Sequence, residues 1–413
     1  MRQKSQILAM TLSALLVALP AQAQEQKPTL NAFINHVLQV SPAIASAEAR
    51  VAAAKANQKA ASRWRYNPEI AFDFEDIDGE DKTNILGLNQ TIDWNGKYKA
   101  SGKTAQFELQ TVQAERDDTR QTTALDVLSA LANYRSAKDI FDLAVERSGL
   151  MERFSELAGN SFNAGDIDQG EYNLAQLALS EAVIAQADAE TTLAQRKQDL
   201  DTSVGFALAD DLVLPSLPEN LPDVPVSQNE VQILTQLPRL RALKNSEEAA
   251  KSAILGARKD RISDPTIGIA SGKDSGADMV GFSVSVPLNI FNSFSAEVDV
   301  AKQQALAEAK SRQNAFHAAR TRLKSSQRSY QLSKKAWLNW QKAGAPALAE
   351  QVDILDRKFK VGDLSATDYL VQIDQALDTK VASKELYSNV WQTWFSWLDA
   401  SGTVKQWLQN SGE

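Results

Sequence analysis

The stretch "FNAGDIDQGEY", residues 162–172, returns as "FKVGDLSATDY" at residues 359–369, 197 positions later. Both copies begin with Phe, place Gly-Asp at the fourth and fifth positions and end on Tyr. A helical pattern flanks each copy, and Gly is the residue that most readily takes the left-handed backbone at the end of a helix. We therefore predict that each copy is a turn between two helices and that the chain repeats one structural unit.

Two further landmarks recur at nearly the same spacing. The segment "SPAIASAEARVAAAKANQ" from Ser41 matches "LPRLRALKNSEEAAKSAI" from Leu237, and "NPEIAF" from Asn67 matches "DPTIGI" from Asp264. The landmarks keep their order and slip by only one residue, which indicates a tandem repeat.

These landmarks divide the chain into a first repeat at residues 24–211 and a second repeat at residues 228–413. Residues 212–227 between them contain four Pro. Because Pro lacks a backbone N–H and breaks helices, we interpret this segment as the connector between the repeats.

The first 23 residues have the features of a secretory signal peptide. Arg2 and Lys4 give a basic start, Ile7–Leu19 is apolar, and Ala21–Ala23 forms a cleavage site of small residues. Gln24 would then be the first mature residue. The apolar run is too short to span a bilayer as a helix, and a buried N-terminal helix is the alternative.

Composition excludes several functions. The net charge of −8 argues against nucleic acid as a partner. The absence of Cys excludes disulfides, thiolate metal sites and a lipid anchor on a mature Cys, so we expect a protein that is not lipidated. His36 and His317 are lone residues, and no catalytic or phosphate-binding motif is present. We expect no enzyme activity, no catalytic residue, no cofactor and no metal site.

Long helices dominate the predicted secondary structure, because the segments are rich in strong helix formers. The predicted helices are residues 42–65, 97–160 and 168–204 in the first repeat and 238–262, 296–360 and 365–400 in the second. Pro346 predicts a kink inside one of them. A helix of about 60 residues is roughly 90 Å long, which favours coiled-coil-like packing over a globular core.

Four short segments alternate apolar and small or polar residues with period two. The predicted strands are residues 68–76, 84–94, 266–272 and 279–288. Two interpretations remain open: hairpins packed on the helices, or transmembrane barrel strands with the apolar face outward. Since four strands cannot close a barrel, the second interpretation requires oligomerisation, and three chains would supply twelve strands.

The mature chain resembles the TolC-type outer membrane efflux factors. The resemblance rests on the tandem repeat, the Gly-Asp turns, "NPEIAFDFEDIDG" from Asn67, "LNQTIDWNGKYKA" from Leu88 and "VSVPLNIFNSF" from Val284. The segments from Asn67 and from Leu88 are most similar to the branch of the family that serves metal-cation exporters of the resistance-nodulation-division class.

The resemblance implies a mainly α fold with a membrane β-barrel portion, in which a homotrimer forms a twelve-stranded barrel and a periplasmic α-barrel. It implies location in outer membrane lipid, with a periplasmic adaptor and an inner-membrane pump as partners. The channel would passively conduct metal cations or small toxic compounds. A duct for protein secretion and a soluble periplasmic coiled-coil scaffold are the alternatives.

In this architecture the turns, at about residues 163–168 and 360–365, lie at the periplasmic tip and dock the adaptor. The residues expected to dock it are Ala164, Gly165, Asp166, Ile167, Val361, Gly362, Asp363 and Leu364. We expect Asp166 and Asp363 to cap the helices that follow.

Three acidic residues near the turns are candidates for a carboxylate ring at a closed aperture. Asp368 matches the family's first acidic position by resemblance, and Glu171 is the counterpart of Asp368 in the first repeat. Asp374 lies two turns further along and does not align with the family's second acidic position, which is Val371 here. Like charges in such a ring raise one another's pKa, and a bound cation relieves the repulsion. For a single acidic residue, ordinary solvation is the competing interpretation.

Trp391, Trp394 and Trp397 recur every third residue and share one helix face. We favour packing against a neighbouring helix, with a membrane or partner interface as the alternative.

Overall fold

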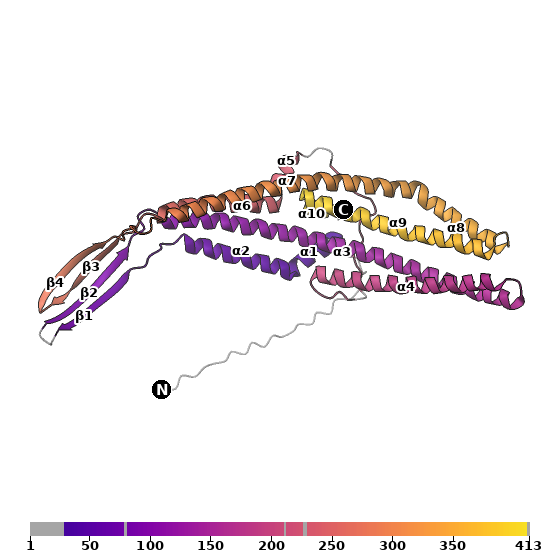
Figure 1. The fold of residues 1–413 in the computed structure, drawn as a ribbon, viewed down its shortest axis with the longest axis horizontal. Helices are drawn as coiled ribbons and strands as arrows, with labels where there is room; N and C mark the ends of the chain where they lie inside the picture. The colour runs from indigo at the N-terminus through magenta and orange to yellow at the C-terminus, as the bar shows by residue number, and fades with distance from the viewer. Residues whose placement is uncertain (1–28, 78–80, 210–211, 226–228, 411–413) are drawn as a thin grey trace, which may run out of the picture.

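The computed structural model describes residues 29–77, 81–209, 212–225 and 229–410. The described chain is elongated, with its strands at one end and helical hairpins at the other (Figure 1). The N-terminal segment interpreted as a signal peptide lies outside the described residues.

Both repeats follow the same order of two helices, two strands, a long helix and a returning helix, but the second repeat divides its long helix and adds α10. The first comprises α1 (Leu30–Val40), α2 (Pro42–Ala61), β1 (Glu69–Ile77), β2 (Asp81–Thr91), α3 (Lys97–Ala164) and α4 (Gln169–Val204). The second comprises α5 (Glu230–Gln236), α6 (Pro238–Asp260), β3 (Thr266–Asp274), β4 (Ala277–Ser285), α7 (Ser295–Asn339), the π-helix η1 (Trp340–Gly344), α8 (Ala345–Lys360), α9 (Ala366–Ser401) and α10 (Val404–Asn410).

The second strand of each hairpin ends three residues earlier than its alternation predicts. Just after β2 the Asp93 carboxylate accepts from the backbone N–H of Lys97 and of Tyr98, both over 2.8 Å, so the chain has already turned toward α3. In β4 the ladder stops at Ser285, two residues before Pro287, which has no N–H to donate. Apolar alternation continues past both ends, which is why the sequence alone overextends the strands.

The strands form one antiparallel sheet in the order β1-β2-β3-β4. The repeats meet at its centre, where Leu88 of β2 pairs with Ile269 of β3. The outer edges of β1 and β4 have no strand partner within the described chain. A sheet with two free edges is a template for pairing with another chain.

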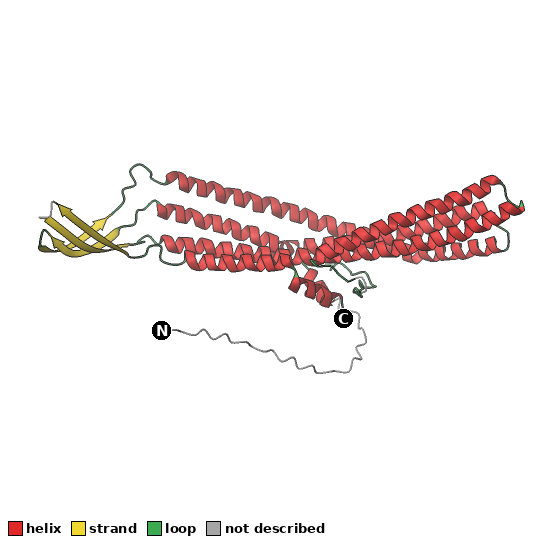
Figure 2. Ribbon diagram, turned by 90° about the horizontal axis from the view of Figure 1, so that it is seen from below, coloured by secondary structure: helices red, strands yellow, loops and turns green. Residues whose placement is uncertain are grey.

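Helices continue from the sheet along the length of the molecule (Figure 2). A straight α3 of 68 residues measures about 100 Å and packs against α2, α4, α6 and α9. About halfway along the molecule, a level that we call mid-height, one helix ends where another begins in both repeats. Gly205 after α4 meets Pro42 of α2, and Gly402 after α9 meets Leu237 before α6.

The second repeat lacks an uninterrupted counterpart of α3. The long helix there contains the five-residue π-helix η1, which ends two residues before Pro346, where the sequence predicts a kink. Gly344 makes this segment possible, because a Cβ there would lie 2.2 Å from the Trp340 ring.

The main core lies at mid-height. Trp391, Trp394 and Trp397 are all buried in it together with α1 and α10, which confirms the prediction of packing over exposure. A second core fills the tip end between α3, α4, α8 and α9.

The described connector residues 212–225 form no helix or strand and are held by one cation from each repeat. Arg135 of α3 donates to the carbonyl oxygens of Leu214 and Pro215, over 2.8 and 2.6 Å. Lys334 of α7 donates in the same way to Leu221 and Pro222, over 3.0 and 2.8 Å.

Candidate functional site

The two Gly-Asp turns have the same backbone geometry. Gly165 and Gly362 take left-handed φ angles of 87° and 80°. In the first turn the Gly165 N–H donates to Phe162 O over 3.0 Å, and the Asp166 N–H donates to Ser161 O over 2.9 Å. The second turn repeats both bonds around Gly362. This pattern satisfies carbonyl groups that the end of a helix leaves without partners.

Aromatic residues close each turn from within the hairpin. Phe162 stacks on Tyr172 with ring centroids 5.2 Å apart, and Phe359 stacks on Tyr369 at 4.4 Å. The first and last residues of the repeated stretch are therefore in contact in both copies. Tyr369 also donates from its hydroxyl to Asp356 over 2.8 Å, and burial raises the pKa of Tyr369 to about 12.

Capping of the helices after the turns differs from the sequence expectation. Asp166 and Asp363 do not cap them. Asp168 caps α4 by accepting from the Glu171 N–H over 2.9 Å, and Ser365 caps α9 by accepting from the Asp368 N–H over 3.0 Å. The reason is spacing: the turn uses Gly-Asp to end the incoming helix, and two more residues are needed before the next one begins.

The eight residues expected to dock an adaptor differ in their exposure to solvent. Ile167 and Leu364 are partly buried and pack on the tip core. The other six are exposed: Ala164, Gly165, Asp166, Val361, Gly362 and Asp363.

A small apolar groove lies just above the turns and was not foreseen from the sequence. It has a volume of about 170 Å³ and lies between the two hairpins. Phe154 and Leu157 of α3, Phe359 of α8 and Leu370 of α9 line it, together with Glu171 of α4. Leu157 is 51% exposed, although its neighbours along the groove belong to the core. The spacing of these residues in sequence matches an ordinary buried face, so no local signal marks the groove.

Asp368 and Glu171 occupy equivalent positions in the first turn of α9 and α4. Asp368 is exposed and accepts from the Ser365 hydroxyl over 2.7 Å. Glu171 is half-buried and accepts from the Asp168 N–H over 3.4 Å, which completes a capping box. Both carboxylates therefore stabilise the start of a helix.

Asp374, the third acidic candidate, faces a cation of its own chain. It forms an ion pair with Arg147 of α3, and the same guanidinium lies 3.0 Å from Asp378. Burial raises the pKa of Asp374, and the positive charge of Arg147 opposes that shift. Within a single chain the structure brings none of the three acidic candidates into contact with another.

The sheet at the opposite end has two chemically different faces. Apolar side chains cover one face and are exposed, with Val280 at 85% and Phe282 at 70%. The exposed apolar residues of this face are Ile70, Phe72, Phe74, Leu86, Leu88, Ile269, Val280, Phe282 and Val284. The other face carries mainly small or polar residues, among them Ala71, Asp73, Gly87, Asn89, Gly268, Ala270, Gly281 and Ser283.

A buried ion pair joins the two repeats where the sheet meets the helices. Lys97 Nζ lies 2.9 Å from Asp264 Oδ2, and both side chains are less than a tenth exposed. The Tyr66 hydroxyl donates to the same oxygen over 2.9 Å, whereas Asp264 Oδ1 has no hydrogen-bond partner among the described residues. The sequence did not suggest this pair, because its members are distant along the chain.

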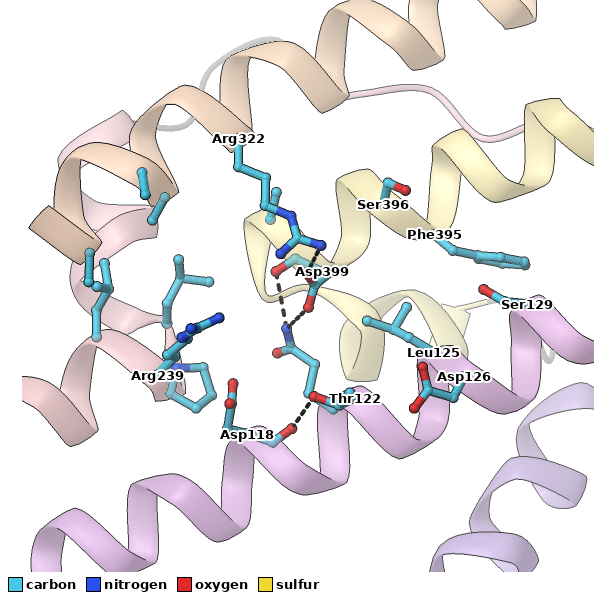
Figure 3. Close-up of a pocket in the computed structure, with 18 residues that line it drawn as sticks. Asp118, Thr122, Leu125, Asp126, Ser129, Arg239, Arg322, Phe395, Ser396 and Asp399 are labelled. Atoms are coloured by element: carbon cyan, nitrogen blue, oxygen red, sulfur yellow. Dashed lines mark hydrogen bonds and ion pairs between the residues drawn. The ribbon is translucent and has the colours of Figure 1, made fainter. Parts of the chain in front are cut away.

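A cavity of about 430 Å³ opens at mid-height between α3, α6, α7 and α9 (Figure 3). On one wall Arg322 pairs with Asp399 over 2.9 Å, and Gln121 donates to the backbone oxygen of Asp399 over 3.1 Å. Asp118 of α3 and Arg239 of α6 also line the cavity. Burial is the main cause that raises the pKa of Asp118, and the nearby Arg239 opposes it.

No described helix has both the length and the apolar character needed to cross a membrane. The described part of the chain also contains no cluster of three or more His, Asp or Glu residues suited to a metal ion.

Comparison with known proteins finds one matching family model and several solved structures of similar fold. Residues 33–206 match the family model of the outer membrane efflux protein. No curated protein matches the chain in sequence at a significant level.

Several solved structures share the fold. The CmeC outer membrane channel of Campylobacter jejuni superimposes with a TM-score of 0.78 at 15% identity, over 100% of this chain and 98% of that one. CusC gives 0.76 at 15% identity over 90% and 91%, and the open state of the MtrE outer membrane channel of Neisseria gonorrhoeae gives 0.71 at 18% identity over 91% and 89%. The chain therefore has the fold of outer membrane channels over nearly its whole length.

Proposed function

We propose that this chain is an outer membrane efflux protein that forms the passive exit channel of a tripartite efflux system. Three copies associate, and each contributes four strands to a twelve-stranded barrel in outer membrane lipid. The helices continue into the periplasm as one tube, with no catalytic step. An inner-membrane pump supplies the energy, and a periplasmic adaptor joins the pump to the tips.

The observation that carries this proposal is the sheet. Nine apolar side chains on one face are exposed to solvent in a single chain, which is a large apolar surface for a water-soluble protein. The opposite face is small and polar, as expected for the wall of a water-filled lumen. Free edges at β1 and β4 allow the sheet to close only by pairing with further copies.

Engineered cysteines test the closed barrel, because the natural chain has none. We would combine Asp73→Cys on β1 with Gly281→Cys on β4 and treat outer membranes with a short bismaleimide. Pairing of β1 with the β4 of a neighbour predicts covalent trimers on a denaturing gel.

The two single-cysteine variants are the matched controls for this experiment. Identical strands in a twelve-stranded barrel are four strands apart, about 19 Å along the wall, so a short reagent cannot join them. Monomers alone from the double variant, or recovery of the mature protein in the soluble periplasmic fraction without detergent, would favour the soluble scaffold instead.

The exported substrate is the finer part of the proposal, and we propose metal cations or small toxic compounds. The exposed carboxylate of Asp368 supports a cationic cargo, since three copies around one axis would place three negative charges near the tip. Deletion of the gene should lower tolerance to divalent metals and leave protein secretion intact. The reverse result would identify a secretion duct.

At the tip we propose that the exposed turn residues and the apolar groove above them contact the adaptor. The groove offers buried apolar area, and the turns present backbone groups at a fixed geometry. Leu157→Glu in the groove should abolish copurification of the adaptor with the channel. Leu177→Glu on α4, 66% exposed and not among the residues that line the groove, is the matched control and should not.

A further inference from the structure

Exposed apolar side chains continue past the sheet toward the helices (Figure 1). We call the segments that join the sheet to the helices, with the adjoining helix turns, the collar: residues 62–68, 92–103, 257–265 and 286–297. Among its exposed apolar side chains are Trp64, Trp94, Leu288, Ile290 and Phe291. The apolar face of the sheet therefore has no sharp lower edge and extends into the collar.

Two of these side chains are amphipathic aromatic residues. The Trp94 indole N–H donates to Ser263 O over 3.0 Å, while its ring is exposed. The exposed Trp64 ring stacks on Tyr98, with ring centroids 6.0 Å apart. Trp and Tyr gather where a membrane meets water. Given the outer membrane location proposed above, on which the following proposal rests, the collar lies at the headgroups of the inner leaflet.

The collar is basic, in a chain whose overall charge is −8. It contains eight Lys or Arg residues against four Asp or Glu residues. All four carboxylates and four of the cations have partners within the chain. The remaining cations are exposed and have no ion pair or hydrogen bond in the part of the chain that the structure describes: Arg63, Lys99, Lys103 and Arg258.

Three of these eight cations stand at the wrong end of a helix. Lys97, Lys99 and Lys103 fall within the first seven residues of α3, and the first turn of α3 has no acidic residue. The start of a helix carries partial positive charge, so cations there lower its stability. Asp264 compensates Lys97, but Lys99 and Lys103 face solvent. An anion supplied from outside the chain would offset this cost.

We propose that the collar binds the phosphate groups of anionic phospholipids in the inner leaflet. Arg63, Lys99 and Arg258 contact the phosphates, and the exposed side chains of Leu288 and Phe291 enter the acyl-chain region. A soluble anion would match the cations but not the apolar residues beside them. A neighbouring copy of the chain would meet the collar with the same excess of cations. An anionic lipid complements both properties, because its headgroup and its chains are joined in one molecule.

The chain contains its own reporter of lipid contact. Trp64 and Trp94 lie in the collar, whereas the other six Trp residues lie in or against the mid-height core or in η1. Brominated acyl chains quench Trp fluorescence on contact. The mature protein would therefore be reconstituted in vesicles that contain brominated phosphatidylglycerol or, as the matched neutral lipid, brominated phosphatidylcholine with the same chains.

Phosphatidylglycerol should associate with the collar at least about fivefold more strongly than phosphatidylcholine, the ratio expected for one cation at an anionic surface. The ratio should fall toward one in about 1 M NaCl, where the Debye length is only about 3 Å. Equal association of the two lipids at low salt would overturn the proposal and leave the outer membrane function intact. Quenching by neither lipid would refute both.

Two triple variants locate the contact. Arg63→Gln/Lys99→Gln/Arg258→Gln should lower the ratio at least about threefold and leave quenching by phosphatidylcholine unchanged. Lys358→Gln/Lys360→Gln/Lys405→Gln removes three exposed cations remote from the sheet and should keep the ratio. An undiminished ratio in the collar variant would overturn the assignment. If that variant failed to insert, a ratio that persists in high salt in the unaltered protein would overturn it instead.

Discussion

Glu171 and Asp368 occupy the same position in the two repeats, the third residue of the helix that leaves each turn, and each is bonded to the residue that caps that helix. An acidic side chain there stabilises the positive end of a helix, so its presence in both repeats has a structural cause. Their environments then diverge, because Asp368 is exposed and Glu171 is half-buried at the groove. This difference makes Asp368 the better candidate for contact with cargo.

Asp368→Asn should therefore weaken block of the channel by divalent cations, because it removes three charges from the trimer. The measurement is conductance in planar bilayers against a titration of Mg²⁺ or Co²⁺. Ser365→Ala is the matched control, since it removes the helix cap and retains the charge. Equal loss of block in both variants would assign the effect to helix capping.

Replacement of the turn glycines should destabilise the tip. Gly165→Ala and Gly362→Ala would force a Cβ into the left-handed region, at about 1–2 kcal/mol each. Gly256→Ala inside α6 is the control of opposite sign, because a Cβ there meets no atom within 4 Å and Ala favours a helix by about 1 kcal/mol. Limited proteolysis at the tip and thermal unfolding measure the two effects, and equal behaviour of all three variants would contradict the assignment.

The buried pair of Lys97 and Asp264 should be more sensitive to loss of one member than of both. Lys97→Met leaves a buried carboxylate unpaired and should cost about 3–5 kcal/mol. The double variant Lys97→Met/Asp264→Leu should recover much of this loss. Thermal unfolding checks both, and a double variant no more stable than the single one would show that the Tyr66 hydrogen bond, not the ion pair, secures the junction.

The stability of the mid-height region should depend on pH through Asp118. Burial raises its pKa in the folded chain, so the folded state binds the proton more tightly than the unfolded state does. That contribution is present below the ordinary carboxyl pKa of about 3.9 and is lost as pH rises through the higher folded value. Asp118→Asn should thus raise stability slightly at pH 7.5, by roughly 0.5 kcal/mol, and the gain should vanish near pH 4.

Asp117→Asn provides the comparison of opposite sign. Asp117 lies 2.7 Å from both Arg116 and Arg241, so its loss should lower stability at neutral pH. A gain in both variants would point to relief of general negative charge and not to burial of Asp118.

The sequence predicted the strands and the turns because local chemistry specifies them. Val280, Phe282 and Val284 alternate strictly with small residues, and Gly165 and Gly362 stand where only a left-handed residue ends the helix well. The ends of β2 and β4 were misjudged because the backbone bonds of Asp93 and the missing N–H of Pro287, not hydropathy, stop the ladder. The same limit explains the wrong helix caps.

Contacts between distant residues could not be predicted. Lys97 and Asp264 are each ordinary charged residues in their own segments, and only the pairing of β2 with β3 brings them together. The apolar groove and the cavity between α3, α6, α7 and α9 arise in the same way, from the meeting of four helices. For Asp374 the sequence showed an acidic residue on the expected side of the turn but not the Arg147 that faces it.

The π-helix gives the two repeats unequal mechanical compliance. A mechanical load applied at one tip would pass along α3 through a continuous ladder of hydrogen bonds, whereas a load at the other tip must cross η1, where the ladder changes register beside the Trp340 ring. Bending strain would concentrate at that break, since a local interruption of the ladder is where long helices kink. The hairpin of the first repeat would therefore be stiffer than the hairpin of the second repeat. A partner that pulls on both tips with equal force would displace the second tip further.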